Sequence, residues 1–211
     1  KLINREISGF ENVNYEELKK NLGRSKIRNE LAGRAKFEFL IFMDCDSKVV
    51  SGDYILNYLF ALKNVKDFKN LSHLIYGGRC YSENLPENTN YLFHWTYGIN
   101  REQTTAKQRK PKPYHSFMTN NFLISKSILN EIQFDESLTQ YGHEDTLFGL
   151  ELKARNIPII HIDNPLEHIG LEETEVFLSK TKKGIQNLYY LSQKNDLIET
   201  RLLNIYRKLK R

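Results

Sequence analysis

Two aspartates that flank a single residue follow an almost wholly apolar run. Asp44 and Asp46 come directly after residues 37–43, and Cys45 stands between them. Side chains two positions apart in an extended segment point the same way, so both carboxylates are expected on one side of the chain. Such a pair can hold a divalent cation, which can in turn hold a diphosphate. The other interpretation is a solvated turn, where aspartate is common.

A second pair of acids opens a helical pattern. Glu144 and Asp145 follow Gly142 and His143 and precede leucines at helical spacing. Carboxylates at the start of a helix suit its dipole, which explains the pair without any chemistry. The chemical interpretation is a general base, a carboxylate that accepts a proton from a hydroxyl group as the hydroxyl becomes a nucleophile. Gly142 would let another molecule approach the backbone closely.

The third chemical group is a histidine in the run Pro165–Gly170. His168 follows a predicted strand that ends at Ile162. A single histidine among apolar neighbours is either a hydrogen-bonded structural residue or a metal ligand. His168 is expected past a strand end, at the same sheet edge as Asp46, which favours the metal ligand more than the residue type alone does. Both interpretations, the structural residue and the metal ligand, stay open.

Alternating helices and strands must position these groups. Apolar periodicity and capping residues predict helices at 15–22, 26–35, 53–64, 126–132, 143–155, 173–195 and 196–211. Short apolar runs predict strands at 37–43, 74–76, 122–124 and 158–162. This order indicates an α/β domain with a largely parallel sheet flanked by helices, whose ligands bind at the carboxyl ends of the strands. In the helix at 53–64, the expected inward-facing side chains are Ile55, Leu56, Leu59, Phe60 and Leu62.

The formal net charge of +5 is concentrated in two segments. Residues 101–113 carry +4 and residues 179–211 carry +7, whereas the remaining 165 residues carry −6. A nucleic-acid-binding protein usually spreads basic residues over a folded face, so this distribution disfavours nucleic acid as a partner. No apolar run approaches the ~20 residues of a membrane span. The only cysteines, Cys45 and Cys80, are too few for a disulfide framework, which favours a reducing cytoplasm.

Both basic segments have two interpretations. The stretch 98–113 contains two prolines and predicts a long loop, either a mobile lid over an anionic ligand or a solvated surface loop. The tail 197–211 either contacts an anionic membrane surface or packs its apolar side on the body and leaves its charges in water. Its apolar residues at helical spacing are Ile198, Leu202, Ile205 and Leu209.

Several motifs occur in an order that resembles a known enzyme family. The run Asn21–Asn29 precedes the apolar segment and the Asp-x-Asp motif of Asp44-Cys45-Asp46. Thr119–Ile124, Phe134-Asp135-Glu136, Gly142-His143-Glu144-Asp145 and a later histidine follow. This order is similar to that of family 2 nucleotide-sugar glycosyltransferases of the GT-A fold, in the branch that resembles galactosyltransferases and chondroitin polymerases. The resemblance covers roughly residues 12–178.

The resemblance implies a Rossmann-like GT-A domain over residues 1–178 and a basic helical extension over 179–211. GT-A domains open with a strand–helix–strand unit that contributes to the nucleotide pocket, and the sequence begins after the position of that unit. His143 stands where better-known relatives often have glycine.

The resemblance also implies a role for individual residues. Asp145 is expected to be the catalytic base that deprotonates the acceptor hydroxyl, and Glu144 to bind the acceptor or donor sugar beside it. Asp46 and His168 are expected to bind Mn²⁺ or Mg²⁺, with Asp44 on the ribose or the metal. Nucleotide contacts are expected from Arg28, Asp44 and Cys45, and sugar contacts from Asn121, Gly142, His143 and Trp95.

Together these expectations describe an inverting, metal-dependent glycosyltransferase. It would move a sugar from a nucleotide diphosphate, such as UDP, to a hydroxyl of a saccharide or lipid-linked saccharide acceptor. It would work in the cytoplasm, at the inner membrane face if the basic tail contacts lipid. The alternative function is a non-catalytic nucleotide- or carbohydrate-binding relative of the same fold. For Trp95, core packing is the alternative to stacking on a sugar face.

Overall fold

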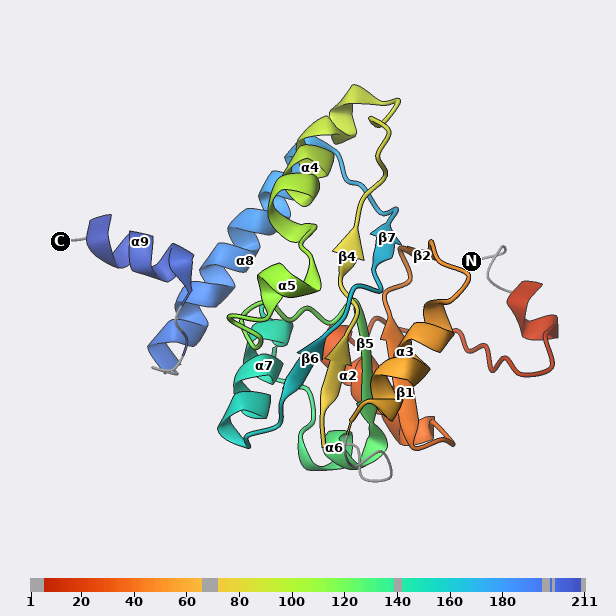
Figure 1. The fold of residues 1–211 in the computed structure, drawn as a ribbon. Helices are drawn as coiled ribbons and strands as arrows, with labels where there is room; N and C mark the ends of the chain where they lie inside the picture. Colours follow the sequence, from red (N-terminus) through yellow and green to blue (C-terminus); the bar gives the residue numbers. More distant parts are fainter. Residues whose placement is uncertain (1–5, 66–71, 139–141, 195–197, 199, 210–211) are drawn as a thin grey trace.

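The protein folds into a mixed α/β structure, shown in Figure 1. The computed structural model describes residues 6–65, 72–138, 142–194, 198 and 200–209. Over these residues the strands form a four-stranded and a three-stranded sheet. None of the described helices is both long and apolar enough to cross a bilayer.

The four-stranded sheet lies in the middle of the protein. Its strands are, in spatial order, β1 (Phe39–Met43), β5 (Asn121–Ser125), β3 (Leu74–Tyr76) and β6 (Ile159–His161). β5 pairs antiparallel with β1 and with β3, whereas β3 and β6 pair in parallel. The predicted strands are therefore confirmed, but the sheet is mixed and not largely parallel. The reason is that the chain between β3 and β5 passes through the second sheet and several short helices, whereas a parallel pair is usually joined by one crossover helix.

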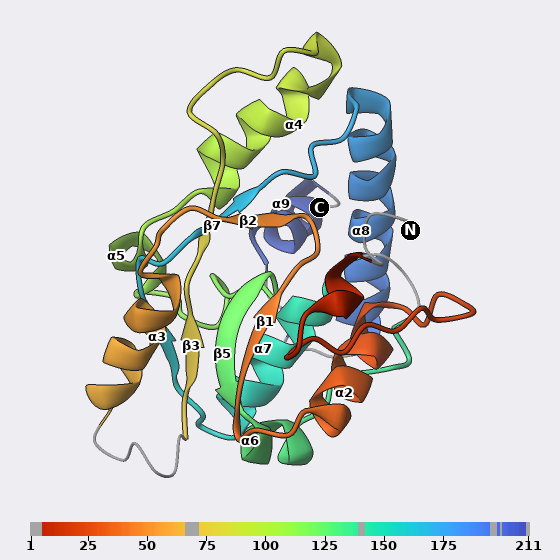
Figure 2. The same ribbon diagram turned by 90° about the vertical axis from the view of Figure 1, so that its right-hand side faces the viewer.

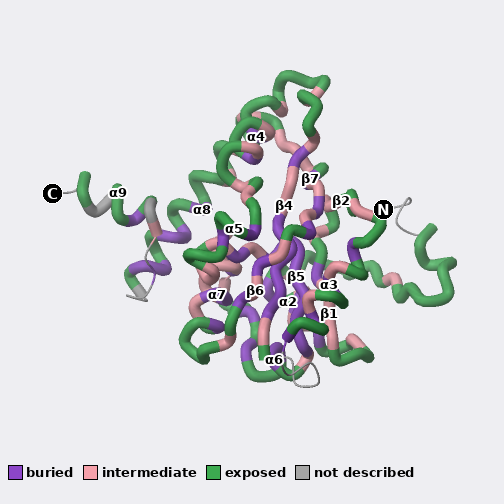
Figure 3. Tube along the Cα trace, in the orientation of Figure 1, coloured by how far each residue is buried: buried purple, intermediate pink, exposed green. Residues whose placement is uncertain are grey.

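Helices cover both faces of this sheet (Figure 2). On one face, α3 (Tyr54–Lys63) packs its buried Tyr54, Tyr58 and Leu62 against side chains that include Ile75 and Leu123. The other face is covered by α2 (Arg24–Arg34), α6 (Lys126–Glu131) and α7 (Glu144–Ala154). Alternate residues of β3 and β5 enter the two layers, as the two-residue period of a strand requires. The buried segments of the trace gather along these strands in Figure 3.

The second sheet lies at the end of the first and was not predicted from the sequence. Its strands are β2 (Ser47–Val49), β7 (Leu166–His168) and β4 (Arg79–Cys80), in that order. β7 is antiparallel to β2 and parallel to β4. Strands of two or three residues are too short to show a periodic pattern, so only their pairing identifies them.

The basic stretch 98–113 is folded and is not the irregular loop predicted above. It follows two short helices, η2 (Thr89–Tyr91) and α4 (Leu92–Tyr97), and consists of a π-helical turn, Gly98–Glu102, and α5 (Ala106–Arg109). Thr105 and Gln108 form a capping box at the start of α5.

Arg109 fixes this stretch to the body of the protein. Its guanidinium is buried and donates hydrogen bonds to the carbonyl oxygens of Thr104 and Ile162, the latter at 2.7 Å, and to Nδ1 of His161 at 3.1 Å. It also lies 5.0 Å from the ring centre of Tyr76. Arg109 is therefore an anchor, and a lid that moves with it is not supported.

The two C-terminal helices are α8 (Thr174–Lys194) and α9 (Arg201–Leu209). Leu188, Leu191, Ile198 and Leu203 form a small core with partly buried leucines that include Leu147 of α7. The predicted boundary between residues 178 and 179 falls inside α8, so that helix continues across it. In the tail, Ile198 is buried whereas Leu202, Ile205 and Leu209 are exposed, so only part of its apolar side packs on the body.

Two local predictions are wrong. Residues 15–22 are not helical, and Gly23, with a positive φ of 81°, stands before the first turn of α2 and does not close a preceding helix. The Asn21 side chain accepts a hydrogen bond from the Gly23 amide at 2.9 Å, which favours a turn.

In α3, Tyr54 and Tyr58 face the core with Leu62, so the predicted inward residues Ile55, Leu56, Leu59 and Phe60 are exposed. Tyr54 and Tyr58 face inward because their hydroxyls donate hydrogen bonds to a buried side chain, as described below.

The remaining described element is a short 3-10 helix, η1 (Glu6–Gly9), near the start of the chain.

Candidate active site

The acidic turn after β1 is held in place by backbone pairing. The Asp44 amide donates to the carbonyl oxygen of Asn120 at 3.1 Å, and the chain then turns directly into β2. β2 pairs with β7 so that Ser47 lies opposite His168. The Ile169 amide extends this pairing by donating to the carbonyl oxygen of Asp46 at 2.9 Å. The short second sheet therefore brings His168 beside Asp46, although 122 positions separate them in the sequence.

Asp46 and His168 face each other with unused hydrogen-bonding capacity. Asp46 Oδ1 and His168 Nδ1 are 3.7 Å apart, and each atom is buried without a hydrogen-bond partner among the described residues. The neighbouring His168 holds the pKa of Asp46 below its usual range. Since buried polar atoms are nearly always paired, two that converge on one point suit a cation between them.

Gly170 makes this approach sterically feasible. A Cβ atom at Gly170 would lie 2.8 Å from both Cβ and Oδ2 of Asp46, closer than side-chain carbons pack. The absence of a side chain at position 170 is therefore what allows the chain after β7 to pass beside the Asp46 carboxylate.

Arg28 joins the acidic turn to the acidic start of α7. Its guanidinium contacts Asp44 Oδ1 at 3.1 Å and Glu144 Oε1 at 3.4 Å, and Arg24 contacts the same Glu144 oxygen at 3.2 Å. The Arg28 and Glu144 side chains are only 10% and 8% exposed, so this ion pair is largely withdrawn from solvent. On its other side Asp44 lies 3.8 Å from Arg79. Two arginines thus occupy the Asp44 carboxylate, which leaves Asp46 as the freer member of the Asp-x-Asp motif.

Asp145 lies in the first turn of α7, next to this ion pair. Its Oδ1 accepts a hydrogen bond from the Thr146 amide at 2.7 Å. Burial, followed by the charge of Glu144, raises the pKa of Asp145 to about 6, against an ordinary value of 3.8. At neutral pH the carboxylate is therefore ionised, yet it binds a proton more strongly than an ordinary aspartate, which are the properties of a general base.

The residues before α7 adopt an unusual backbone conformation. Gly142 and His143 both have positive φ, 86° and 72°, the latter in the left-handed region that is rare for a residue with a side chain. Asn187 of α8 donates to the Gly142 carbonyl oxygen at 2.6 Å and holds this turn. The His143 ring lies 3.3 Å from the Thr146 hydroxyl, and burial lowers its pKa. Left-handed residues kept in place by such contacts often mark functional sites.

Three of the predicted site residues lie apart from this cluster or are otherwise engaged. Cys45 is exposed. Trp95 is half-buried on α4 and donates its indole N–H to the Ser82 carbonyl oxygen at 2.9 Å. Asn121 is fully buried, and its side-chain oxygen accepts from the hydroxyls of Tyr54 and Tyr58, each at 2.7 Å.

The Asn121 amide nitrogen is also fully used. It donates to the carbonyl oxygens of Gly78 at 2.9 Å and Asn164 at 2.8 Å. With every donor and acceptor position filled inside the protein, Asn121 serves in the core and is left out of the site.

The structure adds two groups that sequence patterns did not single out. Arg79 of β4 pairs with Glu102 at 2.8 Å, and Tyr81 donates its hydroxyl to the same carboxylate. His94 stacks on Phe177 with ring centres 4.3 Å apart and lies 5.4 Å from the His168 ring. Their only sequence signal is residue type, because these contacts join segments that are distant along the chain.

Comparison of the chain with protein-family models and with curated proteins finds no match to either. The interpretation of the site therefore rests on its own residues and geometry.

Proposed function

We propose that the protein is an inverting glycosyltransferase of the GT-A type that uses a nucleotide-diphosphate sugar and a divalent cation. The observation that carries the proposal is the Arg28 bridge, which brings the Asp44–Asp46 turn next to the Glu144–Asp145 pair. Arg28 contacts Asp44 and Glu144, which are close neighbours in sequence of the proposed cation ligand Asp46 and the proposed base Asp145. A cation ligand and a base supply the two functions that sugar transfer to a hydroxyl requires.

Asp46 and His168 are the residues proposed to hold Mn²⁺ or Mg²⁺. Their two unpaired, converging atoms suit such an ion. In the described part of the chain, no group of three or more histidine, cysteine or acidic side chains converges as a complete metal cage. At phosphate-binding sites Mg²⁺ is usually held through one or two side chains, water and the substrate's own phosphates, so the proposal needs no more than two protein ligands. When bound, the cation neutralises charge on the departing diphosphate.

Asp145 is the proposed base. Its carboxylate accepts the proton of the acceptor hydroxyl while the hydroxyl oxygen forms a bond to the anomeric carbon of the donor sugar. The bond from that carbon to the diphosphate oxygen breaks on the opposite side, so the configuration at the carbon inverts. The nucleoside diphosphate leaves with the bonding electrons. Arg28 holds Asp44 and Glu144 in place and limits how far the pKa of Asp145 rises.

The position of β1 supports a GT-A arrangement. β1 is the last strand on its side of the four-stranded sheet, and no described residue pairs with its outer edge. In GT-A domains, according to the resemblance, further strands belong to the same sheet, and an unpaired edge at β1 is compatible with that arrangement.

A donor screen tests the function. The chain is incubated with a panel of nucleotide-diphosphate sugars and saccharide acceptors in Mn²⁺, in Mg²⁺ and in EDTA, and release of nucleoside diphosphate is followed. We expect metal-dependent release that Asp145→Asn lowers by at least about 100-fold, the typical contribution of a general base. Glu151→Gln is the matched control, because Glu151 is an exposed carboxylate on the same helix.

The same variant separates the enzyme from a non-catalytic binding protein. Metal-dependent binding of a nucleotide without any transfer, in both the unaltered chain and Asp145→Asn, would refute the enzymatic proposal and favour the binding function. Transfer that is unaffected by EDTA would refute the role of the cation.

We also propose peripheral contact of α9 with an anionic membrane surface on the cytoplasmic side. Leu202 and Leu209 are 42% and 82% exposed on a helix that carries basic residues. Co-sedimentation with vesicles of phosphatidylcholine and phosphatidylglycerol tests this contact. Replacement of both leucines by serine should abolish binding, and binding that survives the replacement would refute it.

A further inference from the structure

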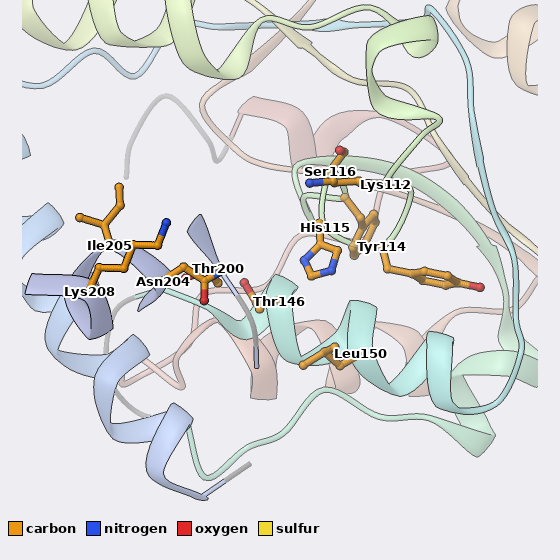
Figure 4. A pocket seen from close by; sticks show the side chains of 11 residues that line it. Lys112, Tyr114, His115, Ser116, Thr146, Leu150, Thr200, Asn204, Ile205 and Lys208 are labelled. Atoms are coloured by element: carbon orange, nitrogen blue, oxygen red, sulfur yellow. The ribbon is translucent and has the colours of Figure 1, made fainter. Parts of the chain in front are cut away.

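A large cavity opens beside Thr146, the residue that follows the proposed base. It has a volume of about 880 Å³ and lies between residues 112–117, the first turns of α7 and the helix α9 (Figure 4). This volume is within the range of about 300–1,000 Å³ that is typical of small-molecule sites.

The cavity is connected to Asp145 through one residue. Thr146 lines the cavity, and its hydroxyl lies 3.4 Å from Asp145 Oδ1, the atom that also accepts the Thr146 amide hydrogen. Figure 4 shows the Thr146 side chain directed toward the space between the 112–117 segment and α9. A molecule in the cavity can therefore place a hydroxyl group near the proposed base.

The charged groups that line the cavity are all basic. Lys112 and His115 stand on one wall and Lys208 on the other, with no carboxylate among the lining residues that the structure describes. Within the same described residues, neither lysine forms an ion pair with an acid. The ammonium groups of Lys112 and Lys208, which face one space without internal partners, create a positive potential there.

We infer that this cavity binds an acceptor saccharide through a phosphate group, held between Lys112, His115 and Lys208. The inference rests on the proposed function, because the bound sugar is the acceptor only if the neighbouring Asp145 is the catalytic base. The phosphate is either that of a soluble sugar phosphate or the headgroup phosphate of a lipid-linked sugar. Lysine and histidine donors on opposite walls form charge-assisted hydrogen bonds with phosphate oxygens.

The α9 position gives the basic tail a specific role in this arrangement. Ile205 and Asn204 also line the cavity, so α9 forms one of its walls. Lys208, one of the basic residues of the tail, would then act on the substrate itself, whether or not the helix also contacts a membrane.

The test measures phosphate binding directly and in EDTA, so that neither the donor nor the cation takes part. Inorganic phosphate and glucose 1-phosphate are titrated into the full chain while the imidazole signals of His115 are followed by NMR. We expect saturable shifts of these signals. Lys112→Met and Lys208→Met should each weaken binding about tenfold, the effect of one lost charge-assisted hydrogen bond of about 1.5 kcal/mol.

Lys153→Met is the control, because Lys153 is exposed on α7 and does not line the cavity. Both lysines to be replaced sit on solvent-accessible segments, so circular dichroism should show an unchanged fold. Unchanged phosphate affinity in both Lys112→Met and Lys208→Met, or shifts equally altered by Lys153→Met, would overturn the inference.

Two further arms identify the source of the phosphate. Phosphatidylcholine vesicles that contain a polyprenyl phosphate are compared with plain phosphatidylcholine vesicles and with soluble glucose 1-phosphate. Binding that needs Lys112 and Lys208 in either arm supports the inference and assigns its source. Phosphate binding without any sugar transfer would leave the cavity assignment standing and refute the proposed function, so the two failures are distinguishable.

Discussion

Replacement of Asp145 by asparagine is expected to make the folded protein more stable at pH 8, although it removes the proposed base. The pKa of Asp145 is about 6 in the folded protein, against an ordinary value of 3.8. The folded state therefore binds a proton more tightly than the unfolded state, and stability falls as the pH rises from about 4 to above 6. Above that range, ionised Asp145 costs the folded state about 3 kcal/mol, since one pKa unit corresponds to 1.36 kcal/mol.

Asparagine removes this cost and keeps the main contact. Its side-chain oxygen can still accept the Thr146 amide hydrogen, which lies 2.7 Å from Asp145 Oδ1. Because Asp145 is partly accessible to solvent, we discount the gain to about 2–3 kcal/mol at pH 8. For a chain of this size, such a gain raises the melting temperature by about 4–10 °C.

The assay is urea denaturation of both proteins at pH 8 and at pH 4.5, with no substrate required. The gain should be largest at pH 8 and should fall to about 1 kcal/mol at pH 4.5, where folded Asp145 is protonated but the unfolded carboxyl is still mostly ionised. Glu151→Gln, an exposed change on the same helix, should stay within about 0.5 kcal/mol at both values. A destabilised Asp145→Asn protein at pH 8, or a gain that does not depend on pH, would refute the electrostatic assignment.

Three other substitutions test the proposed cation site, the buried core around Asn121 and the anchoring of the basic stretch. Gly170→Ala should displace Asp46, because the new Cβ would lie 2.8 Å from its side chain. The rise in melting temperature that Mn²⁺ causes should therefore be smaller in this variant. Gly52→Ala is the control, because its new Cβ would have no atom within 4 Å, and it should leave the rise unchanged. Asn121→Ala should lower the free energy of unfolding by about 3–5 kcal/mol in urea, since four buried partners lose their hydrogen bonds; a loss below about 1 kcal/mol would contradict its assignment to the core. Arg109→Met should lower the free energy of unfolding in urea by about 2–4 kcal/mol. A change near zero would favour the interpretation of residues 98–113 as a mobile lid.

The sequence predicts local elements well where the pattern is long and apolar. Residues 37–43 contain β1, as a short and almost wholly apolar run indicates, and residues 53–64 contain α3, as apolar residues recurring at helical spacing indicate. It fails for β2, β4 and β7, since strands of two or three residues gain their stability from pairing and not from their own sequence. The inward face of α3 is mispredicted for a related reason. Hydrophobicity ranks Ile55 above Tyr54, but it does not register that buried Asn121 accepts hydrogen bonds from the tyrosine hydroxyls.

The types of residue in the site are predictable, whereas their pairing is not. The Asp-x-Asp turn, the Glu-Asp pair and the later histidine are visible as patterns in the sequence. The resemblance groups Arg28 with Asp44, but no pattern indicates that Arg28, on a helix before β1, also contacts Glu144. Ion pairs of this kind depend on the distance between folded segments, and sequence separation carries no information about that distance.

The position of Glu144 shows how this pairing changes the interpretation of a residue. The resemblance implies a sugar contact for Glu144, but in the folded protein its carboxylate is buried and held by Arg24 and Arg28. It is nonetheless the charge that, after burial, does most to raise the pKa of Asp145. The arginines act in the opposite direction, so the pKa stays near 6 and the base remains ionised at neutral pH. Glu144 therefore fits the chemistry best as a positioning residue that tunes the neighbouring base, a role that depends on its negative charge and on its burial rather than on contact with substrate.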